Sequence, residues 1–284
     1  MRIETGSGDS RLFLLKRWNS GRTTQRRNDR SAYSMEISIA AEKYFDWLGF
    51  PVTNTVVTTL LVALLLTGSL SLLSRRLQLV PRGFQNVVET ILDAFMNLAT
   101  DIMGDRETGR KFFPLAATIF FFILISNWMG LLPGMGTVGW SAVHEGHATI
   151  IPFIRSASAD LNMTIALSLV SVFTIQFAGI AALGLRGYAA KFFVSPLHKP
   201  FVLGTVMGLL EMVSEVAKLL SFSFRLFGNV FAGEVLLTVM LHLVPYFVPL
   251  PFLFLEIFVG FIQAAVFAML TLVFIKMART PAAH

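Results

Sequence analysis

Five charged side chains interrupt a long apolar stretch at residues 201–241. They are Glu211, Glu215, Lys218, Arg225 and Glu234. Placing one charged residue at mid-membrane costs roughly 2.5–3.5 kcal/mol on insertion scales. Five such charges would only destabilise a helix that served as a passive membrane anchor. We therefore expect the stretch to take part in ion binding or transfer.

The arginine and the glutamates of this region suit different tasks. An arginine side chain stays protonated, so Arg225 can attract a carboxylate or repel a cation but cannot carry protons. A structural ion pair with a membrane acid is the alternative role for Arg225. A buried carboxyl group can bind and release a proton, because a low-dielectric setting disfavours its charged form; a neutral hydrogen-bonding role is the alternative. Four glutamates are candidates for this proton chemistry: Glu211, Glu215, Glu234 and Glu256.

The helix predicted for this stretch presents its polar groups on two faces. No proline occurs at residues 201–244, so one continuous helix is expected. At 100° per residue, Glu234 points almost directly away from Arg225. The stripe on the Arg225 face is formed by Glu211, Lys218, Ser221 and Asn229. A cation on one face and a carboxylate on another predict an ion path divided into two parts.

The predicted helix is too long to stand upright in a bilayer. It would measure roughly 60 Å, about twice the hydrocarbon thickness, so it must be strongly tilted or must bend, with Gly228 and Gly233 as candidate positions. The last apolar stretch, residues 252–277, carries Glu256 and Gln263 one heptad apart on one face. Gln263 could line a polar path or form a helix-packing hydrogen bond.

The composition is that of an all-α polytopic membrane protein. The chain has 284 residues, 55% of them hydrophobic and 14% charged, and a mean hydropathy of +0.68. It has no cysteine, which excludes disulfides and thiolate chemistry, and no GxxxxGK[ST] loop, so any coupling to ATP must come from a partner. His144, Glu145 and His147 lack the helical two-histidine spacing of zinc proteases, so we expect neither a metal nor a cofactor.

Five membrane-crossing segments and one amphipathic helix are predicted. The amphipathic helix, residues 84–103, is expected to lie on the membrane or against another subunit. Asp160 is the predicted N-cap of the third span. The spans are residues 53–73, 112–132, 161–183, 201–241 and 252–277.

The distribution of Lys and Arg predicts the orientation. Basic residues gather after the first, third and last spans, whereas the long loop before Asp160 has Arg155 alone. The positive-inside rule therefore places the C-terminus in the cytoplasm and the N-terminus outside. Residues 1–34 oppose this pattern, because they hold eight of the 23 basic residues. We expect them to be a disordered extension that can be deleted without loss of assembly, with Met35 as the natural start of a transmembrane domain at residues 35–284.

The stretch SFSFRLFGNVFAGE, residues 221–234, resembles the signature of subunit a of F-type ATP synthases, the stator half of the membrane proton path. The shared pattern is an intramembrane Arg225, an asparagine at Asn229 and AGE ending at Glu234. Supporting similarities are EMVSEVAK before it, SNWMGLLPG at 126–134, PFIRSASADLNMT at 152–164 and EIFVGFIQA in the last span. The resemblance covers about residues 35–278.

The resemblance implies a role for each site residue. Arg225 would be the essential arginine that faces the rotor carboxylate, and Glu234 with Glu256 would line an aqueous half-channel open to the outside. Some members have a histidine opposite an acid at this pair, whereas both residues are acids here. The remaining proton path would include Glu211, Glu215, Lys218, Ser221, Asn229 and Gln263.

The resemblance also implies the setting of the protein. It would be a non-catalytic subunit of the Fo sector in the bacterial plasma (inner) membrane, with its last two helices forming a strongly tilted hairpin. Its partners would be the c-ring proteolipids, the peripheral-stalk b subunits, the lipid bilayer and, indirectly, the F1 sector. No nucleic-acid partner is expected, because the basic excess belongs to residues 1–34.

Three other functions remain open at this point. A sodium-translocating version of the same subunit would be distinguished at the rotor, which would carry the ion-binding carboxylate, and not in this chain. A self-contained secondary transporter would have internal repeats and paired broken helices, which the sequence does not contain. A membrane scaffold without an ion path would have no need of Arg225, Glu234 and Glu256 at these places.

Overall fold

The computed structural model describes residues 43–47, 50–75, 78, 82–132, 139–144, 147–152, 154–192, 201–244 and 247–280. Five helices in these ranges are long and apolar enough to cross a membrane, which confirms the predicted all-α membrane protein with five spans. The five are α2 (Asn54–Ser74), α4 (Arg106–Gly130), α5 (Leu161–Phe192), α6 (Phe201–Leu243) and α7 (Pro249–Arg279). The predictions for residues 1–34 and for Glu145 lie outside the described residues.

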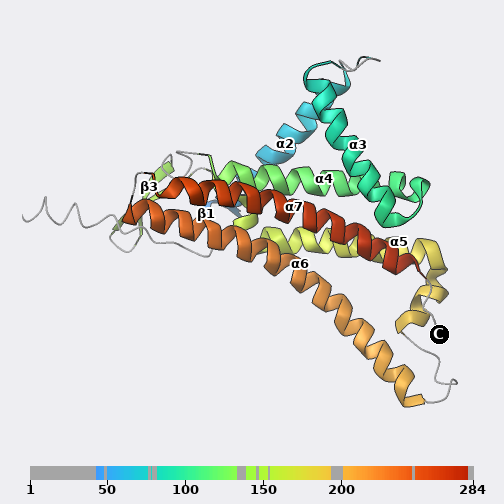
Figure 1. Cartoon of the computed structure of the whole chain (residues 1–284). Coiled ribbons are helices and arrows are strands. Elements are labelled where there is room, and N and C mark those ends of the chain that lie inside the picture. Colours follow the sequence, from blue (N-terminus) through green and yellow to red (C-terminus); the bar gives the residue numbers. More distant parts are fainter. Residues whose placement is uncertain are drawn as a thin grey trace, which may run out of the picture.

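The amphipathic helix α3 (Phe84–Met103) has the predicted bounds. It ends at Gly104, whose positive φ of 78° is the left-handed conformation that glycine adopts without strain. One face of α3 packs against α4 and α7 and buries Ala99 and Met103, while Val87 and Ile91 remain exposed. Figure 1 shows α3 running at a steep angle to α4 and meeting the bundle near the start of α4. Part of its apolar face is therefore covered by its own chain.

The helix α4 begins with a side-chain cap. The backbone N–H of Thr108 donates to the carboxylate of Asp105 at 2.9 Å. This hydrogen bond lowers the pKa of Asp105. The other end of α4 is fastened to α7. The side-chain amide of Asn127 donates to the carbonyl of Gly260 at 3.3 Å, and the indole N–H of Trp128 donates to the carbonyl of Ile257 at 3.2 Å.

The core lies between α4, α5, α7 and part of α6. Phe222 of α6 stacks on Phe267 of α7 with ring centroids 4.8 Å apart, and both rings are almost fully buried. Ile123 of α4 and Ile175 of α5 have no exposed surface. This packing holds the C-terminal half of α6 at a defined rotation against α7, which is what positions the polar residues of both helices.

The helix α5 is interrupted where the third span is predicted to end. Gly184, directly after Leu183, has φ 72° and ψ 161°, so the helical segment beyond it takes a different direction. Tyr188 from that segment folds back onto Gly179, where a Cβ atom would overlap its ring. The predicted N-cap is confirmed, because the N–H of Asn162 donates to Asp160 at 2.9 Å.

The helices α6 and α7 form the predicted hairpin. As predicted, α6 is one helix, and it continues to Leu243. Figure 1 shows α6 beside α7 near the turn that joins them; towards its N-terminus α6 changes direction and diverges from the bundle. This diverging part exposes a series of large apolar side chains: Val206, Met207, Leu209, Leu210, Met212, Val213 and Val216.

Two short antiparallel hairpins, which the sequence did not predict, accompany the helices. One pairs β1 (Lys43–Trp47) with β2 (Phe50–Thr53), directly before α2. The other pairs β3 (Gly139–His144) with β4 (His147–Pro152). The chain then forms the 3₁₀ turn η1 (Ala157–Ala159) before α5. The segment between β4 and η1 contains Arg155, which reaches the candidate site.

Candidate functional site

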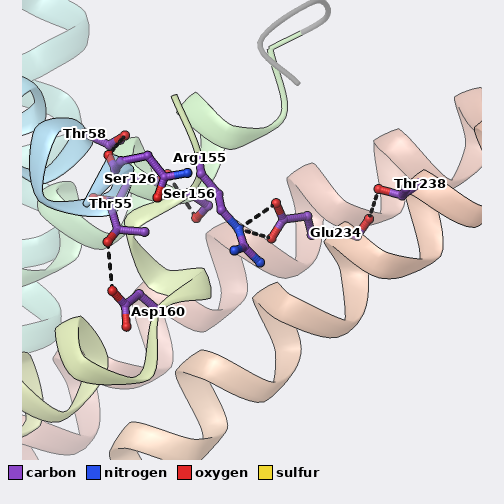
Figure 2. A network of polar contacts seen from close by, with 9 residues as sticks. Thr55, Thr58, Ser126, Arg155, Ser156, Asp160, Glu234 and Thr238 are labelled. Atoms are coloured by element: carbon purple, nitrogen blue, oxygen red, sulfur yellow. Dashed lines mark hydrogen bonds and ion pairs between the residues drawn. The ribbon is translucent and has the colours of Figure 1, made fainter. Parts of the chain in front are cut away.

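Glu234 of α6 forms an ion pair with Arg155. The Nε atom of Arg155 donates to both carboxylate oxygens of Glu234, at 3.0 and 3.1 Å (Figure 2). The side chain of Arg155 is 8% exposed and that of Glu234 is 35% exposed. Because Arg155 is buried and Glu234 is only partly exposed, their charges interact more strongly than those of a fully exposed pair.

Glu256 of α7 lies beside this pair without a cation of its own. It is 8% exposed, and its carboxyl group rests against Gly233, where a Cβ atom would overlap it. Within the described ranges, the Glu256 carboxyl has no hydrogen bond or ion pair, but it is close enough to Glu234 for their charges to interact. We refer to Arg155, Glu234 and Glu256 as the carboxylate cluster.

Figure 2 shows polar side chains from α2, α4 and the η1 region on one side of Arg155 and Glu234 on the other. The hydroxyl of Thr55 donates to Asp160 at 2.8 Å, and the hydroxyl of Ser156 donates to the carbonyl of Ser126 at 3.3 Å. Both polar side-chain atoms of Asn54 and the hydroxyl of Ser126 are buried, and the described residues supply no partner for them. Groups of this kind are the usual sites of buried water.

Arg225 lies elsewhere on α6, in a different environment. Its Nη2 atom donates to the hydroxyl of Ser221 at 3.0 Å, and none of the acids in the described residues forms an ion pair with it. The side chain borders a cavity of about 350 Å³ between α6 and α7. We refer to this cavity as the arginine groove, which is lined by Glu211, Ser214, Ala217, Lys218, Ser221, Phe222, Arg225, Leu270, Phe274 and Met277.

A polar chain links the arginine groove to α5. Lys218 pairs with Glu215 at 2.6 Å, and its Nζ atom lies 5.2 Å from the ring centroid of Phe274. Glu215 accepts from the amide of Gln176 at 2.7 Å, and the hydroxyl of Tyr188 donates to Gln176. Glu215 is therefore held in a network that reaches the helical segment after Gly184.

One hydrogen bond joins α6 and α7 between the two polar regions. The side-chain amide of Asn229 donates to Gln263 at 2.9 Å, so Gln263 makes the helix-packing bond that was one of its two predicted roles. Arg225 and Glu234 are nine positions apart on a continuous helix, which separates them by about 14 Å along the axis and half a turn around it. The structure thus divides the predicted residues into two groups.

Sequence reasoning missed three residues of these groups: Arg155, Gln176 and Tyr188. Arg155 carried a signal, because it is the one basic residue of a long connector and lies in the PFIRSASADLNMT stretch. Gln176 and Tyr188 carried none, since a lone amide or phenol in an apolar span has many packing roles.

The family model described as ATP synthase A chain matches residues 55–276. The chain belongs to the ATP synthase subunit a family. It is similar to the ATP synthase subunit a of Moorella thermoacetica, with 35% identity over 225 residues, which cover 79% of this chain and 90% of the relative. It is also similar to subunit a of Campylobacter jejuni strain 81-176, with 35% identity over 215 residues covering 76% and 85%. Subunit a of Helicobacter pylori strain Shi470 is 37% identical over 221 residues, covering 78% and 85%.

Membership of the subunit a family gives the protein its general role. It is a multi-pass membrane subunit of the Fo sector, with an ion-translocating stator role in ATP synthesis. The matched region begins in α2 and ends in α7, so it reaches all five candidate spans and includes Arg155, Arg225, Glu234 and Glu256.

Proposed function

We propose that this subunit a conducts protons through two half-channels that are separated by Arg225. The observation that carries the proposal is the surroundings of Arg225. It is a permanent cation within a membrane-spanning helix, and no acid of the described residues pairs with it. An unpaired charge in a low-dielectric setting is costly, which favours a carboxylate supplied by another subunit over an internal structural ion pair.

The carboxylate cluster and the arginine groove are the proposed half-channels. A proton would reach the carboxylate cluster from the outside, pass to the carboxylate of a rotor subunit, and leave through the groove after rotation. The buried hydroxyl of Ser126, whose carbonyl binds the Ser156 next to Arg155, supports water there. The offset of about 14 Å between Arg225 and Glu234 supports two compartments rather than one pore.

Arg225 would serve two purposes in this scheme. Its positive charge favours the ionised form of an arriving carboxylate, so the rotor group releases its proton on approach. The same charge repels free protons and prevents them from crossing directly between the half-channels. The gradient that it guards is worth about 2.3 kcal/mol per proton for each 100 mV.

The proposed partners follow from this scheme. The c-ring would lie against Arg225, the b subunits of the peripheral stalk would hold the chain in place, and F1 would be reached only indirectly. The setting would be the bacterial plasma (inner) membrane, with the C-terminus in the cytoplasm and the N-terminus outside, and the chain would not be catalytic by itself. The alternative is a sodium-translocating form of the same machine.

The test is ATP synthesis by the assembled complex in reconstituted vesicles. Arg225→Ala is expected to abolish coupled synthesis and to open a proton leak, and Arg225→Lys is expected to fail as well, because lysine loses the planar fork and holds its proton less firmly. Arg186→Ala, at an exposed position of α5, is the matched control and should leave coupled ATP synthesis unchanged. Near-normal synthesis by fully incorporated Arg225→Ala would overturn the proposal. If ATP synthesis by the unmodified complex required sodium ions, the sodium-translocating alternative would be favoured.

A further inference from the structure

We propose that Arg155 is a positioning residue that holds Glu234 as a carboxylate and thereby makes Glu256 the proton-carrying group of the carboxylate cluster. This inference rests on the proposed function, because it assigns separate tasks to the two acids of one half-channel. It concerns a residue outside the two-helix hairpin that bears both acids.

Arg155 is held rigidly enough to position Glu234. The pair joins residues 79 positions apart in the chain, and both carboxylate oxygens accept from the same Nε atom. The next residue, Ser156, packs so closely on α4 that a Cβ atom on Gly130 would be 2.7 Å from its own Cβ. The hydroxyl of Ser156 also bonds to the carbonyl of Ser126. The backbone that carries the guanidinium is therefore fixed against α4.

The two acids differ in the charged group that faces them. The charged groups that face them, among the described residues, are Arg155 from the segment before η1, Glu234 from α6 and Glu256 from α7. Glu234 has a cation against both of its oxygens, which stabilises its ionised form. Glu256 is buried against the backbone at Gly233 and faces the negative charge of Glu234, and both conditions favour its neutral form.

This arrangement gives a simple proton balance. A proton from water binds to a carboxylate oxygen of Glu256 and neutralises it. When a rotor carboxylate comes alongside, Glu256 releases that proton to it and returns to the ionised form. Glu234 keeps its ion pair with Arg155 throughout, so the cluster exchanges one proton at a time and the negative charge of Glu234 helps to draw each proton in.

The decisive comparison uses variants that remove one or both partners of the ion pair. Glu234→Gln leaves Arg155 as a buried cation without the Glu234 carboxylate and removes the negative charge that draws protons to Glu256, so ATP-driven proton pumping should fall roughly tenfold. Arg155→Gln/Glu234→Gln removes that cation as well, and pumping should recover at least about threefold over the single variant. Arg155→Gln alone should lower pumping roughly tenfold, whereas Arg155→Lys, which keeps the charge, should retain most of it.

Controls separate this inference from the proposed function. Glu256→Gln should abolish pumping whether or not Arg155 is present, and Arg186→Gln should have no effect. A double variant as inactive as Glu234→Gln would overturn the inference, because Glu234 itself would then carry the proton. Normal pumping by Arg155→Gln would also overturn it. Normal pumping by Glu256→Gln as well as Glu234→Gln would instead remove the carboxylate cluster from the path and contradict the proposed function.

A second measurement needs no substitution and so does not depend on the variants assembling. Dicyclohexylcarbodiimide adds covalently to protonated carboxyl groups in apolar surroundings. After treatment of the intact complex at neutral pH, peptide mass spectrometry should find the adduct on Glu256 at several times the level on Glu234. Modification of Glu234 at a level equal to or above that of Glu256 would overturn the assignment.

Discussion

Arg225 and Glu234 share one helix, and the structure surrounds them differently. Glu234 has Arg155 against both of its oxygens, while Arg225 contacts the hydroxyl of Ser221 and no acid of the described residues. A structural ion pair within the chain would have satisfied Arg225, as Lys218 is satisfied by Glu215. The difference is what supports an interaction between Arg225 and a second protein.

At the residue scale, replacing both acids of the carboxylate cluster should stop proton access. Glu234→Gln/Glu256→Gln keeps the side-chain sizes but removes the titratable groups, so pumping should fall by a factor of roughly 100 or more, the usual weight of a positioned acid–base group. The measurement is ATP-driven quenching of a pH-sensitive dye in vesicles, with incorporation checked by immunoblot. Asp93→Asn, at an exposed position of α3, is the control. Unchanged pumping by the double variant would exclude these acids from the path.

At the scale of elements, the contact of α6 with α7 depends on Gly233. The carboxyl group of Glu256 occupies the space that a side chain at this position would need. The hydrogen bond between Asn229 and Gln263 joins the same two helices about one turn away. The local spacing of α6 and α7 is therefore coupled to the placement of an ionisable group.

Two glycines of α6 provide a matched pair that tests this coupling. Gly233→Ala should displace Glu256 and destabilise the contact by about 1–3 kcal/mol, the usual cost of overpacking, with a clear loss of pumping. Gly228→Ala has no atom within 4 Å of its new Cβ, so it should keep the activity and gain up to about 1 kcal/mol from better helix propensity.

Thermal unfolding of the purified complex and pumping in vesicles would be measured for both variants. Equal behaviour of the two alanine variants would mean that the close approach at Gly233 has no bearing on transport.

At the scale of the whole molecule, the bundle leaves much apolar surface uncovered. The part of α6 that diverges from the other helices exposes large apolar side chains, as does α2. Within a bilayer, lipid or a neighbouring subunit can cover this surface.

Purification in mild detergent tests whether the chain works alone. A tagged chain should co-isolate with a small two-helix proteolipid, and vesicles that contain only the purified chain should show no coupled ion transport. The matched sample is the same preparation with the proteolipid and the remaining Fo and F1 subunits restored, in which pumping should return. Substrate-coupled transport by the isolated chain would favour the self-contained transporter instead.

Much of this architecture follows from local sequence. The five spans need only apolar runs of sufficient length, and the bounds of α3, the break after Leu183 and the cap at Asp160 follow from helical periodicity, a glycine and an N-capping side chain. The unusual charges of α6 and α7 are also visible in the sequence, because any charge in an apolar span is conspicuous.

Tertiary structure alone decided how those charges are grouped. Arg155 looked like one loop cation, and only the packing of the η1 region on α4 brings it to Glu234, 79 residues away. Sequence likewise does not reveal that Glu256 rests on Gly233, or that Glu215 joins Gln176 and Lys218. Helical periodicity determines which residues share a face of one helix, but the neighbour of that face and its distance are set by side-chain packing across the whole bundle.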